Sequence, residues 1–156
     1  MSVENVKKFF AQRDASKKIL EFENSTATSE QAANVLNCQL GQIAKTLSVF
    51  VKNFPILILM SGDMKLDNKK FKAFFGNRPR MIPVDEVENF IGHAVGGVCP
   101  FAVNAGIKIF LDESLKRFEK IYCAAGSSNT LVELHRAELK NFINFEWIDV
   151  SAPKFL

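Results

Sequence analysis

Apolar residues recur along this chain with two spacings, and each spacing predicts one kind of secondary structure. A repeat of three or four positions is typical of an amphipathic helix. One such segment begins with Thr28, which forms a capping-box pattern with Gln31 three residues later. Proline or glycine bounds others of these segments, as expected at helix ends. The spacing predicts helices over residues 1–12, 28–36, 67–76 and 83–92, with short helical segments at 112–118 and 136–143.

Runs of aliphatic and aromatic residues bounded by turn residues predict the strands. The clearest pair covers residues 43–51 and 55–60, whose short connection favours a β-hairpin. Residues 130–134 fit either a strand or a helix, and we interpret them as a strand. Further strands are predicted at 19–22, 107–111, 121–125 and 145–150. Because helices and strands mix without strict alternation, we expect an α+β fold: a curled, barrel-like mixed β-sheet surrounded by helices, in one domain of residues 1–156.

A lysine interrupts the apolar face of one predicted strand. Alternate residues of a strand share a face, which places Lys45 in a row with Ile43, Leu47 and Val49. An ammonium on an apolar face costs desolvation free energy unless it reaches water, an anion or a carbonyl. Lys45 therefore either extends to solvent from near a strand end or points into a pocket.

A glycine-rich loop follows the helix predicted for residues 83–92. Gly92, Gly96 and Gly97 lie within six residues of one another among aliphatic neighbours, and Pro100 ends the loop. Glycine permits positive φ and a close approach of ligand to backbone. Adjacent N–H groups held rigidly can bind an anion or a polarised carbonyl without a charged side chain. The alternative is a tight buried turn that binds nothing.

The composition argues against several classes of function. The chain has 156 residues, 47% of them hydrophobic and 24% charged, which is typical of a globular domain. Its cysteines, Cys38, Cys99 and Cys123, are odd in number and widely spaced, which argues against disulfides and a zinc site. No apolar run approaches membrane-spanning length. We therefore expect a cytoplasmic protein without metal, cofactor or membrane partner.

Basic residues are concentrated in one segment, residues 65–80, although the net charge of the chain is only +3. In that segment Asp67 is the one acidic residue. Such a run is either a solvated helix face or a surface that contacts a phosphate backbone. The six basic residues are Lys65, Lys69, Lys70, Lys72, Arg78 and Arg80.

Three motifs occur in a fixed order along the chain. They are the strand lysine in Gln42-Ile43-Ala44-Lys45-Thr46-Leu47, the pattern GxxxGGVxP from Gly92 to Pro100, and the turn Gly126-Ser127-Ser128-Asn129 followed by Leu131-Val132-Glu133-Leu134. With these motifs the chain resembles the YbaK/EbsC family of aminoacyl-tRNA deacylases, which is related to the editing domain of bacterial prolyl-tRNA synthetase. The resemblance covers residues 30–150. Phe101-Ala102-Val103 departs from it, because the glycine often found after the Pro-Phe step is absent.

The resemblance implies a freestanding trans-editing hydrolase that cleaves the ester of mischarged aminoacyl-tRNA carrying a small amino acid. It implies that Lys45 lies in the pocket, where it anchors a phosphate or orients the ester, and that Gly96 and Gly97 surround the acyl group. Paired N–H groups there would stabilise the tetrahedral oxyanion. The basic segment would contact the acceptor end of tRNA, and an aminoacyl-tRNA synthetase is a further expected partner. The residues expected to contact substrate are Thr46, His93, Val95, Val98, Cys99, Pro100, Gly126, Ser127 and Ser128.

Two other functions fit the same residues. One is a non-catalytic module that binds tRNA or an acyl group without turnover. The other is a hydrolase in which Cys99 is the nucleophile and His93 its base, although a thiol in this aliphatic context is more typical of an inert core cysteine. His93 is either a residue of the pocket rim or a structural histidine. Ser127 and Ser128 lack a His/Asp pair for a catalytic triad, which favours hydrogen bonding to substrate or turn capping.

Overall fold

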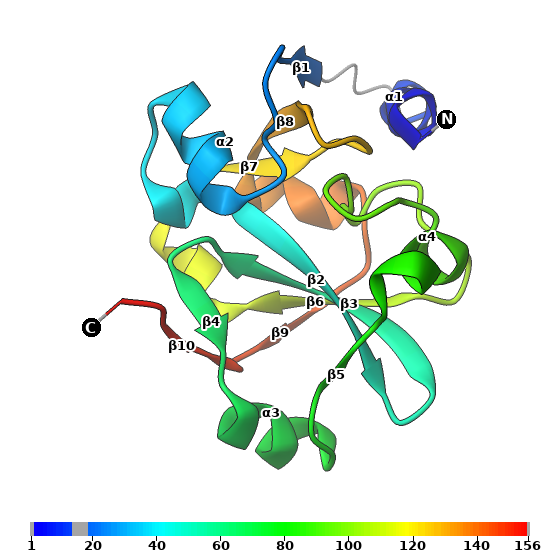
Figure 1. Ribbon diagram of the computed structural model, residues 1–156, viewed down its shortest axis with the longest axis vertical. Helices are drawn as coiled ribbons and strands as arrows, with labels where there is room; N and C mark the ends of the chain where they lie inside the picture. Colours follow the sequence, from blue (N-terminus) through cyan, green and yellow to red (C-terminus); the bar gives the residue numbers. More distant parts are fainter. Residues whose placement is uncertain (1, 14–18, 156) are drawn as a thin grey trace.

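The computed structural model of the protein describes residues 2–13 and 19–155 (Figure 1). The helix predicted for residues 1–12 forms α1, and Met1 lies outside the described residues. The other predicted helices also form, the two short ones as 3₁₀ segments. The helices are α1 (Ser2–Ala11), α2 (Ser29–Leu36), α3 (Asn68–Phe75) and α4 (Val84–Ile91), and the 3₁₀ segments are η1 (Leu40–Gln42), η2 (Glu113–Arg117) and η3 (Arg136–Asn141).

The strands of the described residues fall into three sheets. The largest is mixed and has the order β5-β2-β3-β6-β9, from β5 (Arg80–Met81), β2 (Ala44–Val51), β3 (Phe54–Ser61), β6 (Lys108–Asp112) and β9 (Glu146–Ile148). An antiparallel sheet has the order β1-β8-β7, from β1 (Ile19–Glu21), β8 (Thr130–His135) and β7 (Lys120–Ala124). The third sheet pairs β4 (Met64–Leu66) with β10 (Ser151–Pro153).

The predicted hairpin of β2 and β3 is the centre of the large sheet. Its register places Ala44 opposite Ser61 and Val51 opposite Phe54. β3, β6 and β9 run parallel, and a single bridge from Ile43 to Tyr122 joins the start of β2 to the antiparallel sheet. The mixed α+β class predicted from the sequence is confirmed. The curled arrangement is built from bridged sheets rather than from one closed barrel of the described strands.

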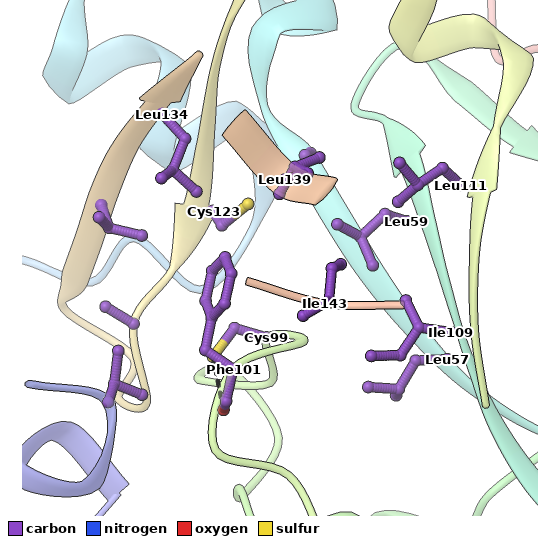
Figure 2. Close-up of a cluster of buried hydrophobic side chains, with 14 of the residues drawn as sticks. Leu57, Leu59, Cys99, Phe101, Ile109, Leu111, Cys123, Leu134, Leu139 and Ile143 are labelled. Atoms are coloured by element: carbon purple, nitrogen blue, oxygen red, sulfur yellow. Dashed lines mark hydrogen bonds between the residues drawn. The ribbon is translucent and has the colours of Figure 1, made fainter. Parts of the chain in front are cut away.

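Both faces of β3 are buried, which explains the unbroken apolar run at residues 56–60. Leu57 and Leu59 of β3 face the main core, and Figure 2 shows them beside Ile109 of β6 and opposite Phe101. α1, α4, the antiparallel sheet, the loop after α4 and the 3₁₀ segments η2 and η3 also contribute to this core. On the other face of the sheet, Ile56, Ile58 and Met60 of β3 pack with α3 in a second core.

Three short strands, β4, β5 and β10, were not predicted from the sequence. Each has only two or three residues, which is too few to show an alternating pattern. The pairing of β4 with β10 nevertheless matters for the position of the chain's last described residues. It places Ala152 opposite Lys65, and Lys154 N–H donates to Asp63 O at 2.9 Å. The C-terminal segment therefore lies beside β4, as Figure 1 shows.

Candidate active site

A cavity of about 500 Å³ lies between β2, the beginning of α2 and the glycine-rich loop after α4. This volume is within the usual range for sites that bind small molecules. Most of its wall is aliphatic, with polar groups concentrated near α2 and the first half of β2. Of the residues predicted from the sequence, five line this cavity: Lys45, Thr46, Val95, Gly96 and Val98.

Lys45 is half-buried on the β2 wall of the cavity. Its Nζ donates a hydrogen bond to the backbone carbonyl of Met64. Burial and the nearby charge of Lys154 lower the pKa of Lys45, whereas the carboxylates of Glu30 and Asp63 act in the opposite direction. The sequence left two positions open for Lys45, extension to solvent or a place in a pocket, and in the structure Lys45 lines a pocket.

The first turn of α2 supplies a carboxylate that the sequence analysis missed. The predicted capping box forms: Thr28 Oγ1 accepts the N–H of Gln31 at 3.1 Å, and Gln31 Oε1 accepts the N–H of Thr28 at 3.2 Å. This cap fixes the start of the helix, so that Glu30 lies on the cavity wall. Glu30 Oε2 accepts a hydrogen bond from Lys154 Nζ at 2.7 Å, and Lys154 lines the cavity too.

The electrostatic environment of Glu30 keeps its carboxylate ionised. The hydrogen bond from Lys154 is the main cause that lowers the pKa of Glu30, and the charges of Lys154 and Lys45 add to it. Glu30 and Lys154 are 124 residues apart in the sequence. The capping box could have located the helix start from the sequence, but nothing in the sequence pattern pairs these two residues.

The glycine-rich loop adopts the conformations that its glycines suggest. Gly92 has a φ of 108° and Gly96 a φ of 96°, which side-chain-bearing residues rarely adopt. Gly97 has another role, because a Cβ there would lie 2.4 Å from the backbone carbon of Gly126. Gly97 is thus needed for a close approach of two backbone segments.

Within residues 2–13 and 19–155, only one amide of the predicted oxyanion pair lacks a hydrogen-bond acceptor. Gly97 N–H donates to Ala94 O at 3.0 Å, and Gly97 O accepts the N–H of Gly126 at 3.0 Å. Among the described residues, no acceptor is hydrogen-bonded to the N–H of Gly96. Gly96 lines the first cavity and Gly97 does not, so a second donor for an oxyanion there must come from elsewhere.

The predicted serine turn lies on a different cavity. Gly97, Gly126, Ser127 and Ser128 line a second space of about 280 Å³ beside the N-terminus of α1, and Val95 is common to both cavities. The hydroxyl of Ser127 is bonded within the turn, to Asn129 Oδ1 at 2.8 Å and to the Thr130 hydroxyl at 2.7 Å. This geometry corresponds to turn capping.

Three predicted substrate contacts, His93, Cys99 and Pro100, are buried and line neither cavity. His93 Nε2 donates to Phe101 O at 2.6 Å, which fixes the ring as a structural histidine. Burial lowers the pKa of His93. These contacts favour the structural alternative for His93.

Cys99 does not have the environment of a catalytic nucleophile. Burial raises its pKa to about 12, so the thiolate is not formed at neutral pH. Its Sγ lies 3.5 Å from His93 Nε2, but that nitrogen carries its proton toward Phe101. Figure 2 shows Cys99 and Cys123 among the apolar side chains of the main core.

The six basic residues of segment 65–80 are exposed, but they are not equivalent. Lys70 Nζ pairs with Asp149 at 3.0 Å and donates to Ser151 O at 2.7 Å. The Arg80 guanidinium donates to Lys52 O at 3.2 Å and lies over the Phe50 ring. Within residues 2–13 and 19–155, no acidic side chain pairs with the remaining four, which are Lys65, Lys69, Lys72 and Arg78.

Two further properties concern the described part of the chain. It contains no group of three His, Cys, Asp or Glu side chains arranged to hold a metal ion. None of its helices is long and apolar enough to cross a membrane; α1, for example, has only ten residues.

Comparison with known proteins shows the family to which this chain is similar. The model of the aminoacyl-tRNA editing domain matches residues 23–142. The chain is 43% identical to the uncharacterized protein YwhH of Bacillus subtilis, over 96% of this chain and 97% of YwhH. It is 25% identical to EbsC of Enterococcus faecalis, proposed to be a Cys-tRNA(Pro)/Cys-tRNA(Cys) deacylase, over 81% of this chain and 79% of EbsC.

A solved structure extends the comparison to three dimensions. A crystal structure of a proposed trans-editing enzyme for prolyl-tRNA synthetase superposes with a TM-score of 0.88 and 28% identity, covering 97% of each chain. The resemblance to the YbaK/EbsC deacylases that the motifs indicate is confirmed. The chain belongs to the aminoacyl-tRNA editing domain family.

Proposed function

We propose that this chain hydrolyses the ester bond of mischarged aminoacyl-tRNA that carries a small amino acid. The observation that carries the proposal is the cavity of about 500 Å³ that both Lys45 and Gly96 line, the latter with an N–H that has no acceptor among the described residues. Both are donors suited to an oxyanion or a phosphate. Membership of the editing-domain family supports the same activity.

The proposed reaction needs little from the protein beyond donors and a shaped space. Water attacks the carbonyl carbon of the ester and a tetrahedral oxyanion forms. The bond from that carbon to the ribose oxygen then breaks, and the ribose oxygen takes up the proton that the attacking water loses. Gly96 N–H would donate to the oxyanion, and Lys45 would either donate to it or hold the terminal phosphate. The aliphatic wall, which includes Ile82, Val87 and Leu131, suits a small side chain.

The glycine-rich loop favours a second candidate function, a module that binds aminoacyl-tRNA without turnover. The N–H of Gly97 is occupied by Ala94 O, so one of the two expected oxyanion donors is missing. Removal of one such donor typically lowers kcat by about 10²- to 10³-fold. A cavity that lacks this donor can bind an aminoacyl ester and still hydrolyse it slowly.

A panel of labelled aminoacyl-tRNAs distinguishes the two functions. The panel contains Ala-, Cys-, Ser- and Thr-tRNAs, each correctly charged and mischarged. We expect at least one mischarged ester to disappear with many turnovers per protein molecule. If every ester survives at the buffer rate, the hydrolase is contradicted. If an ester survives longer in the complex than in buffer, the binding module is favoured.

A further inference from the structure

An aminoacyl ester differs from other acyl esters of the same shape in its α-ammonium group. Transfer of this charge from water into a largely aliphatic cavity is costly unless an acceptor replaces the hydrogen bonds to water. A site that offers such an acceptor gains selectivity, because an analogue without the group leaves the acceptor unpaired. The charged residues that line the cavity are the first candidates for this acceptor.

Glu30 provides the only carboxylate among the described residues that line the cavity. Its carboxylate accepts hydrogen bonds from Lys154 and from the backbone of Glu30, and the two oxygens, with about four lone-pair sites, keep the capacity to accept a further one. A bond between an ammonium and a carboxylate is charge-assisted and stronger than one to a hydroxyl. The nearby Thr28 hydroxyl already accepts the N–H of Gln31.

Two separate parts of the fold hold Glu30 at the cavity. The capping box fixes the first turn of α2 on one side. On the other side, β10 pairs with β4, and the Lys154 N–H donates to Asp63 O, which brings Lys154 Nζ to Glu30. Lys154 lies beyond residues 23–142, the part of the chain that the family model matches. The C-terminal segment thus adds to the cavity a group from outside the matched domain.

The balance of charge in the cavity also points to Glu30. Lys45 and Lys154 are both cationic groups on its wall, and an entering ammonium would be repelled by each of them. The carboxylate of Glu30 lies within the electrostatic influence of both lysines and offsets this repulsion. Without it, the wall near Lys45 would admit anions but disfavour the amino end of the substrate.

We propose that Glu30, positioned by Lys154, binds the α-ammonium group of the aminoacyl ester and makes the cavity selective for esters with a free amine. The inference rests on the proposed deacylase function, because it concerns how the same cavity recognises its substrate.

The test compares two esters on the same tRNA. One is the aminoacyl-tRNA of the panel that the wild-type protein hydrolyses fastest, and the other is its α-hydroxyacyl counterpart, made by deamination with nitrous acid. We expect Glu30→Gln to lower kcat/KM for the aminoacyl ester about fivefold, because the Glu30 side chain is 50% exposed and water screens part of its bond to an ammonium. The same variant should change hydroxyacyl hydrolysis by less than about twofold, since this ester has no ammonium for Glu30 to bind.

Two more variants complete the test. Glu30→Asp keeps a carboxylate and should restore most of the preference for the amine. Glu113→Gln is the matched control, because Glu113 pairs with Lys116 at 2.9 Å on η2 and does not line the cavity. It should leave both rates unchanged. Thermal unfolding of each variant shows whether it is folded.

The outcomes separate this inference from the function on which it rests. An equal loss on both esters in Glu30→Gln, or full activity on the aminoacyl ester, overturns the role of Glu30 and leaves the deacylase intact. If Glu30→Gln does not fold, failure of Glu30→Asp to prefer the aminoacyl ester overturns it instead. A wild-type protein that hydrolyses neither ester contradicts the deacylase itself, and the inference falls with it.

Discussion

Lys45 and the unpaired lysines of segment 65–80 carry the same functional group in opposite surroundings. Lys45 is half-buried in a cavity, where burial lowers its pKa and its ammonium is hydrogen-bonded to Met64 O. Lys69 and Lys72 extend from α3 into solvent without an acidic partner among the described residues. A charge in a cavity acts strongly on whatever enters it, because little water screens it, whereas a solvated charge acts weakly and depends on salt. We therefore expect Lys45 to control turnover and the unpaired lysines of segment 65–80 to control affinity for tRNA.

Replacement of Lys45 should have the largest effect. We expect Lys45→Met to lower kcat for ester hydrolysis on the order of 10²-fold, as for loss of one oxyanion donor, with a smaller change in KM. Steady-state kinetics on the mischarged tRNA measures both constants. Lys120→Met is the matched control, since Lys120 is an exposed lysine on β7 that lies outside the cavity. A rise in KM with unchanged kcat would instead assign Lys45 to phosphate binding.

The pH dependence of hydrolysis tests the same charge without a change at Lys45. Because burial and Lys154 lower the pKa of Lys45, its ammonium is lost at a lower pH than that of an ordinary lysine. Activity should therefore fall as the pH rises through this lowered pKa, after spontaneous hydrolysis is subtracted. Lys154→Met removes one cause of the shift and should move the fall to higher pH. A profile that is the same in both proteins would show that Lys45 does not titrate in this range.

The exposed lysines should give the smallest effect per residue. We expect the triple variant Lys65→Ala, Lys69→Ala and Lys72→Ala to raise KM for tRNA severalfold and to leave kcat nearly unchanged. Removal of each lysine that binds a phosphate should also make the log–log salt dependence shallower by about 0.7 to 0.9. The control is Lys70→Ala, because Lys70 is already paired with Asp149 and Ser151 O. Equal salt slopes in the triple variant and the wild type would identify these lysines as a solvated helix face.

Much of the fold could be predicted because its elements carry strong local patterns. The strands β2 and β3 have long aliphatic runs, and the helix start at Thr28 has a complete capping box. The short strands β4 and β10 carry no such pattern, because tertiary pairing rather than sequence periodicity defines them. Their position determines where Lys154 lies, so a sequence analysis that does not predict these strands cannot place Lys154 in the site.

In the candidate site, too, only the residues with a local sequence signal could be predicted. Lys45 and Gly96 stand out locally, one as a charge in an apolar strand and the other as part of a glycine cluster. The pairing of Glu30 with Lys154 depends on two segments that only the fold brings together. Composition also could not show that Gly97 donates its N–H within the loop, or that His93 and Cys99 turn toward the core.

The close approach of Gly97 to Gly126 has a consequence for motion. The two loops meet backbone to backbone, with no space for even a methyl group at Gly97, and they share the hydrogen bond from Gly126 N to Gly97 O. Segments joined so closely move together, because neither can shift alone without a clash or a broken bond. We therefore expect side chains elsewhere on the cavity wall, rather than these loops, to accommodate a bulkier acyl group. Met81 and Val84, which are exposed at 54% and 74%, have the freedom to turn aside there.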